Sequence, residues 1–317
     1  MRTLHIVSIF LLFFSVSTVY GQKTFNEYVE KTGSEKIQKS ISMDVFTKPV
    51  ANKSATDGHG KNPYFTSESQ LPKKIALITF NVNDLGYFKA SGAAGGVVVT
   101  TFRHLTEAGG NMVATNFHDQ SIDKLKASFE KYGVELQTPQ EFLDTPEKIK
   151  FYNEEFVPQV SKLGEFMSNI ENRKSDISAS ADDYRYFDMG AAFDFLRAES
   201  LGYDLTKELG VDAVFSIGFV IQTDKKEGTF HWVKMAMHGP NPVPKQDKKY
   251  VAQNSGNGYN NGQLYVGGTL TLKKPISFME IRKEEIVSMD LEGIENIFAP
   301  FIDRFYSEIY NSIEKAK

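Results

Sequence analysis

One group of residues in the chain has side chains that could support acid–base chemistry or metal binding. His104, Glu107 and His118 lie within a short stretch, and imidazole and carboxylate groups both carry protons and bind metals. Their spacing matches neither His-Glu-x-x-His nor a similar metal-site pattern. Solvated or hydrogen-bonded histidines are therefore the favoured interpretation, and the group stays a candidate enzyme site. The sequence assigns no catalytic residue, cofactor or metal ligand elsewhere.

A second candidate is the uncharged, glycine-rich stretch Ser91–Phe102, SGAAGGVVVTTF. A phosphate-binding loop places glycines between a strand end and a helix N-terminus, but these glycines do not fit Gly-x-Gly-x-x-Gly. Residues 90–102 are long enough for a membrane β-strand, which needs about 9–11 residues, although clean apolar–polar alternation is missing. We expect a close-packed segment in which small residues let backbones approach, with membrane insertion as an alternative.

Two aromatic-rich segments, residues 182–195 and 254–265, are predicted to form loops. Tyrosine combined with asparagine and glycine is typical of adaptable binding loops. The sequence therefore predicts a partner-binding surface that uses five aromatic residues, Tyr184, Tyr186, Phe187, Tyr259 and Tyr265. The alternative is that these aromatic side chains anchor the loops to the core, which agrees with the burial tendency of such residues.

Residues 1–21 have the features of a secretory signal peptide. Arg2 precedes the apolar core Ile6–Val16, and small or moderate-sized residues lead to Gly21. A membrane-spanning helix needs about 20 apolar residues, so we expect cleavage rather than a retained anchor. The chain contains no cysteine, which excludes thiol catalysis and thiolate metal sites. These features predict an exported bacterial protein, periplasmic or associated with the outer membrane.

The charge of the chain is ordinary, with a formal net value of −4. Nucleic-acid binding needs a stripe of basic residues that neutralises phosphates, and the sequence has none. We therefore expect no nucleic-acid partner. No second apolar run approaches spanning length, so no stable transmembrane helix is expected in the mature chain.

Residues 73–317 alternate between strand-like and helix-like patterns, whereas residues 22–72 are polar and are predicted to be an N-terminal arm or linker. Strands are expected at Lys73–Phe80, from Val134, and at Val211–Thr223, Glu227–Gly239 and Gln263–Lys274. Helices are expected at Ser121–Gly133, 190–209 and Glu292–Glu314, with a helical insertion near 146–172 and a polar loop at Arg173–Asp183. This order predicts a single main α/β domain: a mixed sheet flanked by helices, with a long C-terminal amphipathic helix that Pro300 kinks or divides.

Two of these segments resemble periplasmic α/β modules similar to the TolB N-terminal domain and the curli-secretion lipoprotein. KKIALITF (Lys73–Phe80) is similar to their early strand, and LTKELGVDAVFSIGFV (Leu205–Val220) to a later helix–turn–strand unit. The chain departs from those families because it lacks a lipid-anchor cysteine and carries the insertion after Glu147. The resemblance implies a non-catalytic envelope module that binds proteins.

We therefore expect an exported protein-binding module or assembly component whose partner is another envelope protein. Two alternatives stay open. One is a secreted, hydrolase-like enzyme with a dispersed site around His104, Glu107 and His118. The other is an oligomeric outer-membrane-associated assembly that inserts residues 90–102.

Overall fold

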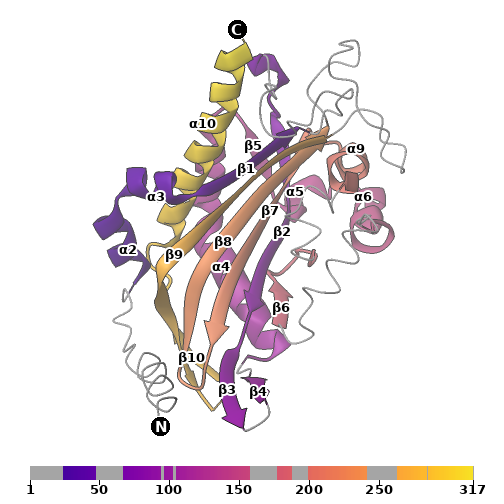
Figure 1. Ribbon diagram of the computed structural model, residues 1–317. Coiled ribbons are helices and arrows are strands. Elements are labelled where there is room, and N and C mark those ends of the chain that lie inside the picture. Colours follow the sequence, from indigo (N-terminus) through magenta and orange to yellow (C-terminus); the bar gives the residue numbers. More distant parts are fainter. Residues whose placement is uncertain are drawn as a thin grey trace.

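The computed structural model describes residues 24–47, 67–93, 96–102, 105–157, 177–187, 199–240, 263–283 and 285–316. These residues form a mixed eight-stranded sheet with helices on both faces and a separate two-stranded sheet (Figure 1). The predicted fold class is confirmed: one domain, a mixed sheet, and a long helix at the C-terminal end. The predicted signal peptide at residues 1–21 lies outside the described residues.

The parallel half of the sheet is built around β2 (Lys74–Asp84) and β7 (Ala213–Thr223), which lie side by side. Both strands are apolar along most of their length and almost wholly buried, as expected for strands covered on both faces. β5 (Glu135–Gln137) runs parallel to β2 at its start, and β6 (Ile177–Ser180) pairs antiparallel with its end. The segment expected as a polar loop at Arg173–Asp183 therefore contains a strand.

The antiparallel half continues from β7 through β8 (Glu227–Pro240) to β9 (Gln263–Arg282). Two short strands share β9 as their neighbour: β1 (Ser42–Thr47) at its start and β10 (Glu285–Met289) at its end. The hairpin from β7 to β8 and the β9 strand confirm the sequence expectation. β9 is longer than expected because it continues through Pro275, where the pairing with β8 is irregular.

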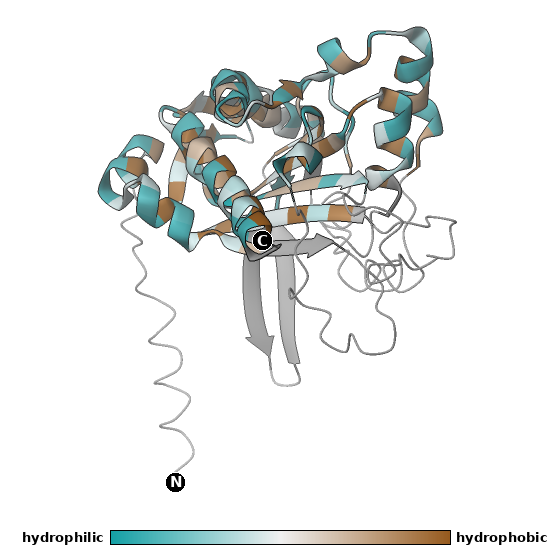
Figure 2. Ribbon diagram, turned by 90° about the horizontal axis from the view of Figure 1, so that it is seen from above, coloured by the Kyte–Doolittle hydropathy of each residue, from teal (hydrophilic) through white to brown (hydrophobic). Residues whose placement is uncertain are grey.

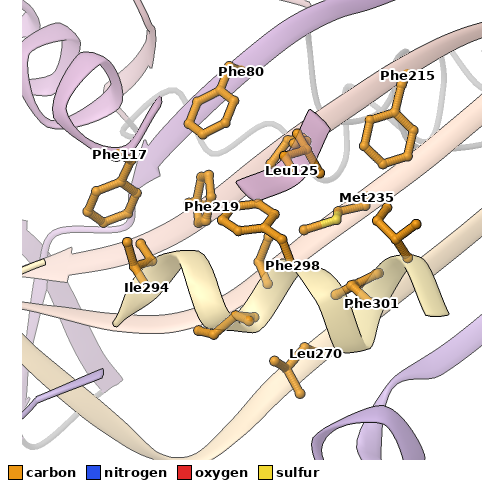
Figure 3. Packing of buried hydrophobic residues seen from close by; sticks show 14 of the residues in the cluster. Phe80, Phe117, Leu125, Phe215, Phe219, Met235, Leu270, Ile294, Phe298 and Phe301 are labelled. Carbon is orange, nitrogen blue, oxygen red and sulfur yellow. The ribbon is translucent and has the colours of Figure 1, made fainter. Parts of the chain in front are cut away.

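Four helices cover one face of the sheet: α2 (Phe25–Thr32), α3 (Ser34–Ser40), α4 (Glu107–Glu130) and α10 (Phe298–Ala316). Figure 3 shows Phe298 and Phe301 of α10 beside the sheet residues Phe219 and Met235. All four of these side chains are at most 1% exposed, so they form the centre of the larger core. Seen from above, α10 carries both hydrophobic and hydrophilic bands, as an amphipathic helix does (Figure 2).

The opposite face is covered by short elements: α5 (Pro139–Phe142), α6 (Pro146–Lys150), the π-turn η2 (Phe151–Glu155), the 3₁₀ turn η3 (Glu199–Gly202) and α9 (Asp204–Leu209). Thr145 caps α6, and Pro146 occupies its first position. Gly210 follows α9 in a left-handed conformation and ends it, in agreement with the expected helix end at residue 209. Residues 158–176 of the predicted insertion and residues 188–198 lie outside the described residues.

α4 begins more than three turns earlier than the helix predicted at Ser121–Gly133. Thr106 caps it by accepting a hydrogen bond from the Gly109 amide, and Ser121 is a buried residue in its middle. Gly109 and Gly110 weaken the helical pattern at the start of α4, because glycine disfavours helix formation. The predicted stop is nevertheless correct, since Gly133 follows the helix in a left-handed conformation with φ of 67°.

The predicted C-terminal helix changes type before Phe298, whereas Pro300, the expected point of division, lies inside an unbroken α-helix. A 3₁₀ turn, η5 (Ile294–Ile297), comes first, and α10 starts at Phe298. Pro300 then lies in the first turn of α10, where its missing N–H leaves no helical hydrogen bond unmade. Across the part of the chain that the structure describes, no helix combines the length and apolarity needed to cross a membrane.

The expectation of an N-terminal arm or linker at residues 22–72 needs correction for residues 24–47. They form α2, α3 and β1, and β1 pairs with β9. Phe25 is fully buried, with its ring centroid 5.4 Å from that of Phe230 and 6.4 Å from that of Phe117. The low density of apolar residues concealed this packing, because a few large side chains carry it.

The glycine-rich stretch is a β-hairpin. β3 (Tyr87–Ala93) pairs in register with β4 (Gly96–Phe102), and within the described residues these strands form a sheet of their own. Figure 1 shows this hairpin at the end of β2, beyond the main sheet. Gly92 and Gly96 therefore lie in an antiparallel hairpin, whereas a phosphate loop would lie between a strand and a helix.

The docking of residues 24–47 predicts a large effect of removing the Phe25 ring. Phe25→Ala should lower the free energy of unfolding by about 3–5 kcal/mol, because it leaves a cavity among the three rings of Phe117, Phe230 and Phe278. Glu30→Ala, on the exposed face of the same helix, should change it by less than about 0.5 kcal/mol. Urea unfolding of both variants measures the difference, and equal values would contradict the docking.

Candidate functional site

The structure does not assemble the candidate enzyme site. Glu107 and His118 both lie on α4, but they are eleven positions apart, which separates them by about 16 Å along the helix axis. Glu107 is exposed in the first turn of the helix. His104 lies outside the described residues. A site that needs Glu107 and His118 together is therefore not formed, because the helix that carries both extends through the residues between them.

His118 is instead partly buried and bridges two neighbours. Its Nδ1 lies 2.9 Å from an Asp119 carboxylate oxygen and its Nε2 lies 3.1 Å from the Tyr184 hydroxyl. Its ring meets Phe80 edge-on, with 5.4 Å between centroids. Burial raises the pKa of Tyr184 well above its usual value, so this phenol stays neutral. The arrangement ties α4 to the segment after β6, as the hydrogen-bonded interpretation of the histidine predicted.

The predicted aromatic binding surface is wrong for three of its five residues. Tyr184, Phe187 and Tyr265 are 6%, 2% and 2% exposed, so their side chains belong to the core. Tyr186 is half-buried, and its hydroxyl donates to the Asn83 side-chain oxygen at 3.3 Å. Tyr259 lies outside the described residues. The anchoring alternative is correct for the buried three, because aromatic rings this large gain most by leaving water.

The sequence did not predict a buried polar network around Thr79 and Asn81, in the middle of β2. The Thr79 hydroxyl oxygen lies 2.6 Å from the Asn81 side-chain oxygen and 2.9 Å from the Arg185 carbonyl oxygen, so its one proton is shared between these two acceptors. The Asn81 amide nitrogen donates to the Phe187 carbonyl at 2.6 Å. The Tyr152 hydroxyl donates to the Ile78 carbonyl at 2.5 Å and accepts from the Arg185 amide at 3.0 Å. These bonds hold residues 184–187 across the sheet, so the network has a structural role.

A signal for this network exists in the sequence. In TFNVND (Thr79–Asp84), Asn81 and Asn83 alternate with apolar residues, so a strand places both on one face. Buried polar groups need hydrogen-bond partners, which predicts that a second segment with polar backbone groups covers that face. The partner segment, residues 184–187, has no pattern that identifies it.

Asp84 closes β2 and fixes the start of the hairpin. It is 1% exposed, and one carboxylate oxygen accepts from the Gly86 amide at 2.9 Å and the Thr223 amide at 3.0 Å. The other oxygen accepts a short hydrogen bond from the Thr223 hydroxyl. Leu85 continues the pairing through its amide, 3.0 Å from the Ile221 carbonyl. The carboxylate therefore joins β2 to β7 at the point where the chain leaves for β3.

The described residues hold no group of three or more His, Asp or Glu side chains placed to bind a metal ion. His118, Asp84 and the polar network each make hydrogen bonds to other residues of the domain.

This account predicts that Asp84→Asn destabilises the fold. The amide keeps the size of the carboxylate but loses its charge and one acceptor, so the free energy of unfolding should fall by about 1.5–3 kcal/mol. Asp224→Asn is the matched control, because Asp224 accepts two amide hydrogen bonds in an exposed turn and asparagine can replace it there. Chemical unfolding of both variants tests this, and an Asp84→Asn effect no larger than the control effect would contradict it.

In comparisons with known proteins, no family model, no curated protein and no solved structure matches the chain.

Proposed function

We propose that the chain is exported and acts as a protein-binding module or assembly component of the cell envelope. The N-terminal sequence supports export, and the resemblance to periplasmic binding modules agrees with the role. The observation that carries the proposal is the β3–β4 hairpin, which forms a separate sheet. The chain enters this hairpin next to Asp84, whose carboxylate is held by hydrogen bonds from the Gly86 and Thr223 amides.

The register of the hairpin divides its residues between two faces. Cross-strand partners in an antiparallel pair lie on the same face, and successive residues alternate. One face therefore receives mainly apolar positions, the pairs Phe88–Thr101, Ala90–Val99 and Gly92–Val97. The other face receives the charged residue Lys89, paired with Thr100, and the pair Ser91–Val98, together with the aromatic pair Tyr87–Phe102 at the base of the hairpin. A two-stranded hairpin alone is marginally stable in water. A partner protein that covers its apolar face would stabilise it, and this supports a binding role.

Membrane insertion of residues 90–102 is the second candidate, and the same apolar face favours it. The length of the strands favours the protein partner. Each strand pairs over seven residues, whereas a membrane β-strand needs about 9–11. A protein surface has no such length requirement, so we favour a protein partner.

The hairpin offers a matched pair of variants. Val98 and Val99 are neighbours of one residue type on opposite faces. Val99→Lys should reduce an in-cell cross-linked complex with an envelope protein at least about tenfold, because it places an unpaired charge in the covered face. Val98→Lys should leave the complex within about twofold of the wild-type level.

The measurement is cross-linking of the tagged chain in its native host, followed by mass spectrometry of the captured protein. Wild-type protein that captures no envelope protein, or two variants that behave alike, would contradict the proposal. Binding of wild-type protein to lipid vesicles, lost only in Val99→Lys, would favour the membrane candidate instead.

Export has its own test. Because cleavage is expected after Gly21, protein recovered from the envelope fraction should begin at Gln22. Intact-mass spectrometry of the fractionated cells measures this. A chain that retains Met1 and stays in the cytosol would overturn export while leaving the hairpin experiment valid with purified protein.

A further inference from the structure

A surface groove lies where β10 meets α4, at the end of the sheet that also carries the hairpin (Figure 1). It consists of two hollows of about 530 and 430 Å³ that share Met289 and Asp290. β8, β9 and β10 line the first hollow, and α4 with residues 289–292 lines the second. We call the two together the β10 groove.

The strand β10, which contributes to both hollows, is an edge strand. In the described part of the chain, β10 pairs with β9 alone, so its second edge faces away from the sheet. α4 runs beside β10, since a Cβ added to Gly109 would lie 3.9 Å from Ile286 Cδ1. Two large apolar side chains on these elements are exposed: Met112 of α4 at 51% and Val287 of β10 at 52%. An edge with exposed apolar neighbours suits an extended polypeptide that adds backbone hydrogen bonds.

Val287 lies at an irregularity in the pairing of β10 with β9. Such bulges discourage indiscriminate pairing at sheet edges. A ligand of this edge must therefore gain affinity from side-chain contacts as well as from backbone hydrogen bonds.

The charges of the groove identify the chemistry of those contacts. Its lining contains one lysine, Lys226, and five carboxylates: Asp119, Glu227, Glu280, Asp290 and Glu292. Arg282 lies 2.6 Å from Glu280 and so offsets one of them. The remaining excess of negative charge complements a basic ligand. Because the groove lies beside an edge strand, a basic polypeptide is the ligand class that fits this charge.

We propose that the β10 groove binds an extended, basic segment of a partner polypeptide, with an apolar side chain of that segment against Met289, which lines both hollows. This inference rests on the proposed function, since it gives the protein-binding module a surface and its partner a chemistry.

The test uses the full chain and a fluorescent peptide of alternating lysine and valine, with a glutamate–valine peptide as the control ligand. The basic peptide should bind, more weakly as salt rises, and the acidic peptide should not. Asp290→Asn combined with Glu292→Gln should raise the dissociation constant about fivefold. Glu130→Gln combined with Glu147→Gln removes the same charge from exposed positions outside the groove and should change it less than about twofold.

Equal binding of the two peptides, or equal losses in the two double variants, would overturn the proposal. A second copy of this chain could supply the basic run Pro244–Lys249 instead. Salt-sensitive self-association that disappears both in the groove variant and in Lys248→Gln/Lys249→Gln would replace the partner by a second copy, and so overturns the inference.

The in-cell cross-linking experiment distinguishes failure of the proposed function from failure of the β10 groove as the binding surface. If wild-type protein captures no envelope protein, the proposed function fails. If it captures one, and the Asp290→Asn/Glu292→Gln variant captures the same amount, only the β10 groove is wrong.

Discussion

The structure depends on the need to cover both faces of the β2–β7 pair. These parallel strands are apolar along most of their length, and leaving either face in water would forfeit the main favourable contribution to folding. The solution is asymmetric. Long helices, α4 and α10, cover one face, whereas short elements from α5 to α9 cover the other. The described residues therefore form two core layers, one on each face of the sheet, and the hairpin and the β10 groove lie at one end of that sheet.

This constraint explains which parts of the fold the sequence predicted. β7 and α10 carry strong patterns, a continuous apolar run and a regular apolar stripe, and both were predicted close to their observed positions. The first half of α4 was missed because Gly109 and Gly110 weaken the helical signal. The docking of residues 24–47 on the sheet was not predicted for a different reason. Phe25 and Ile37 pack against residues far away in the sequence, and local periodicity does not predict such contacts.

The candidate site was less predictable than the fold. A list of reactive side chains cannot show that Glu107 and His118 occupy different turns of one helix, since that depends on where the helix begins. Tyr184, Phe187 and Tyr265 belong to segments with loop-like composition, yet their rings are buried. The β10 groove had no sequence signal, because β10 has only five residues and its acidic neighbours come from four separate segments.

The central claim is that the hairpin end of the sheet is a surface for another polypeptide. Hydrogen–deuterium exchange of the chain, alone and in complex with the envelope protein that it captures, measures this most directly. The account predicts slower exchange of backbone amides in β3, β4 and β10 on binding, with little change in α9 at the opposite end. Protection confined to elements outside the hairpin and the β10 groove would contradict it.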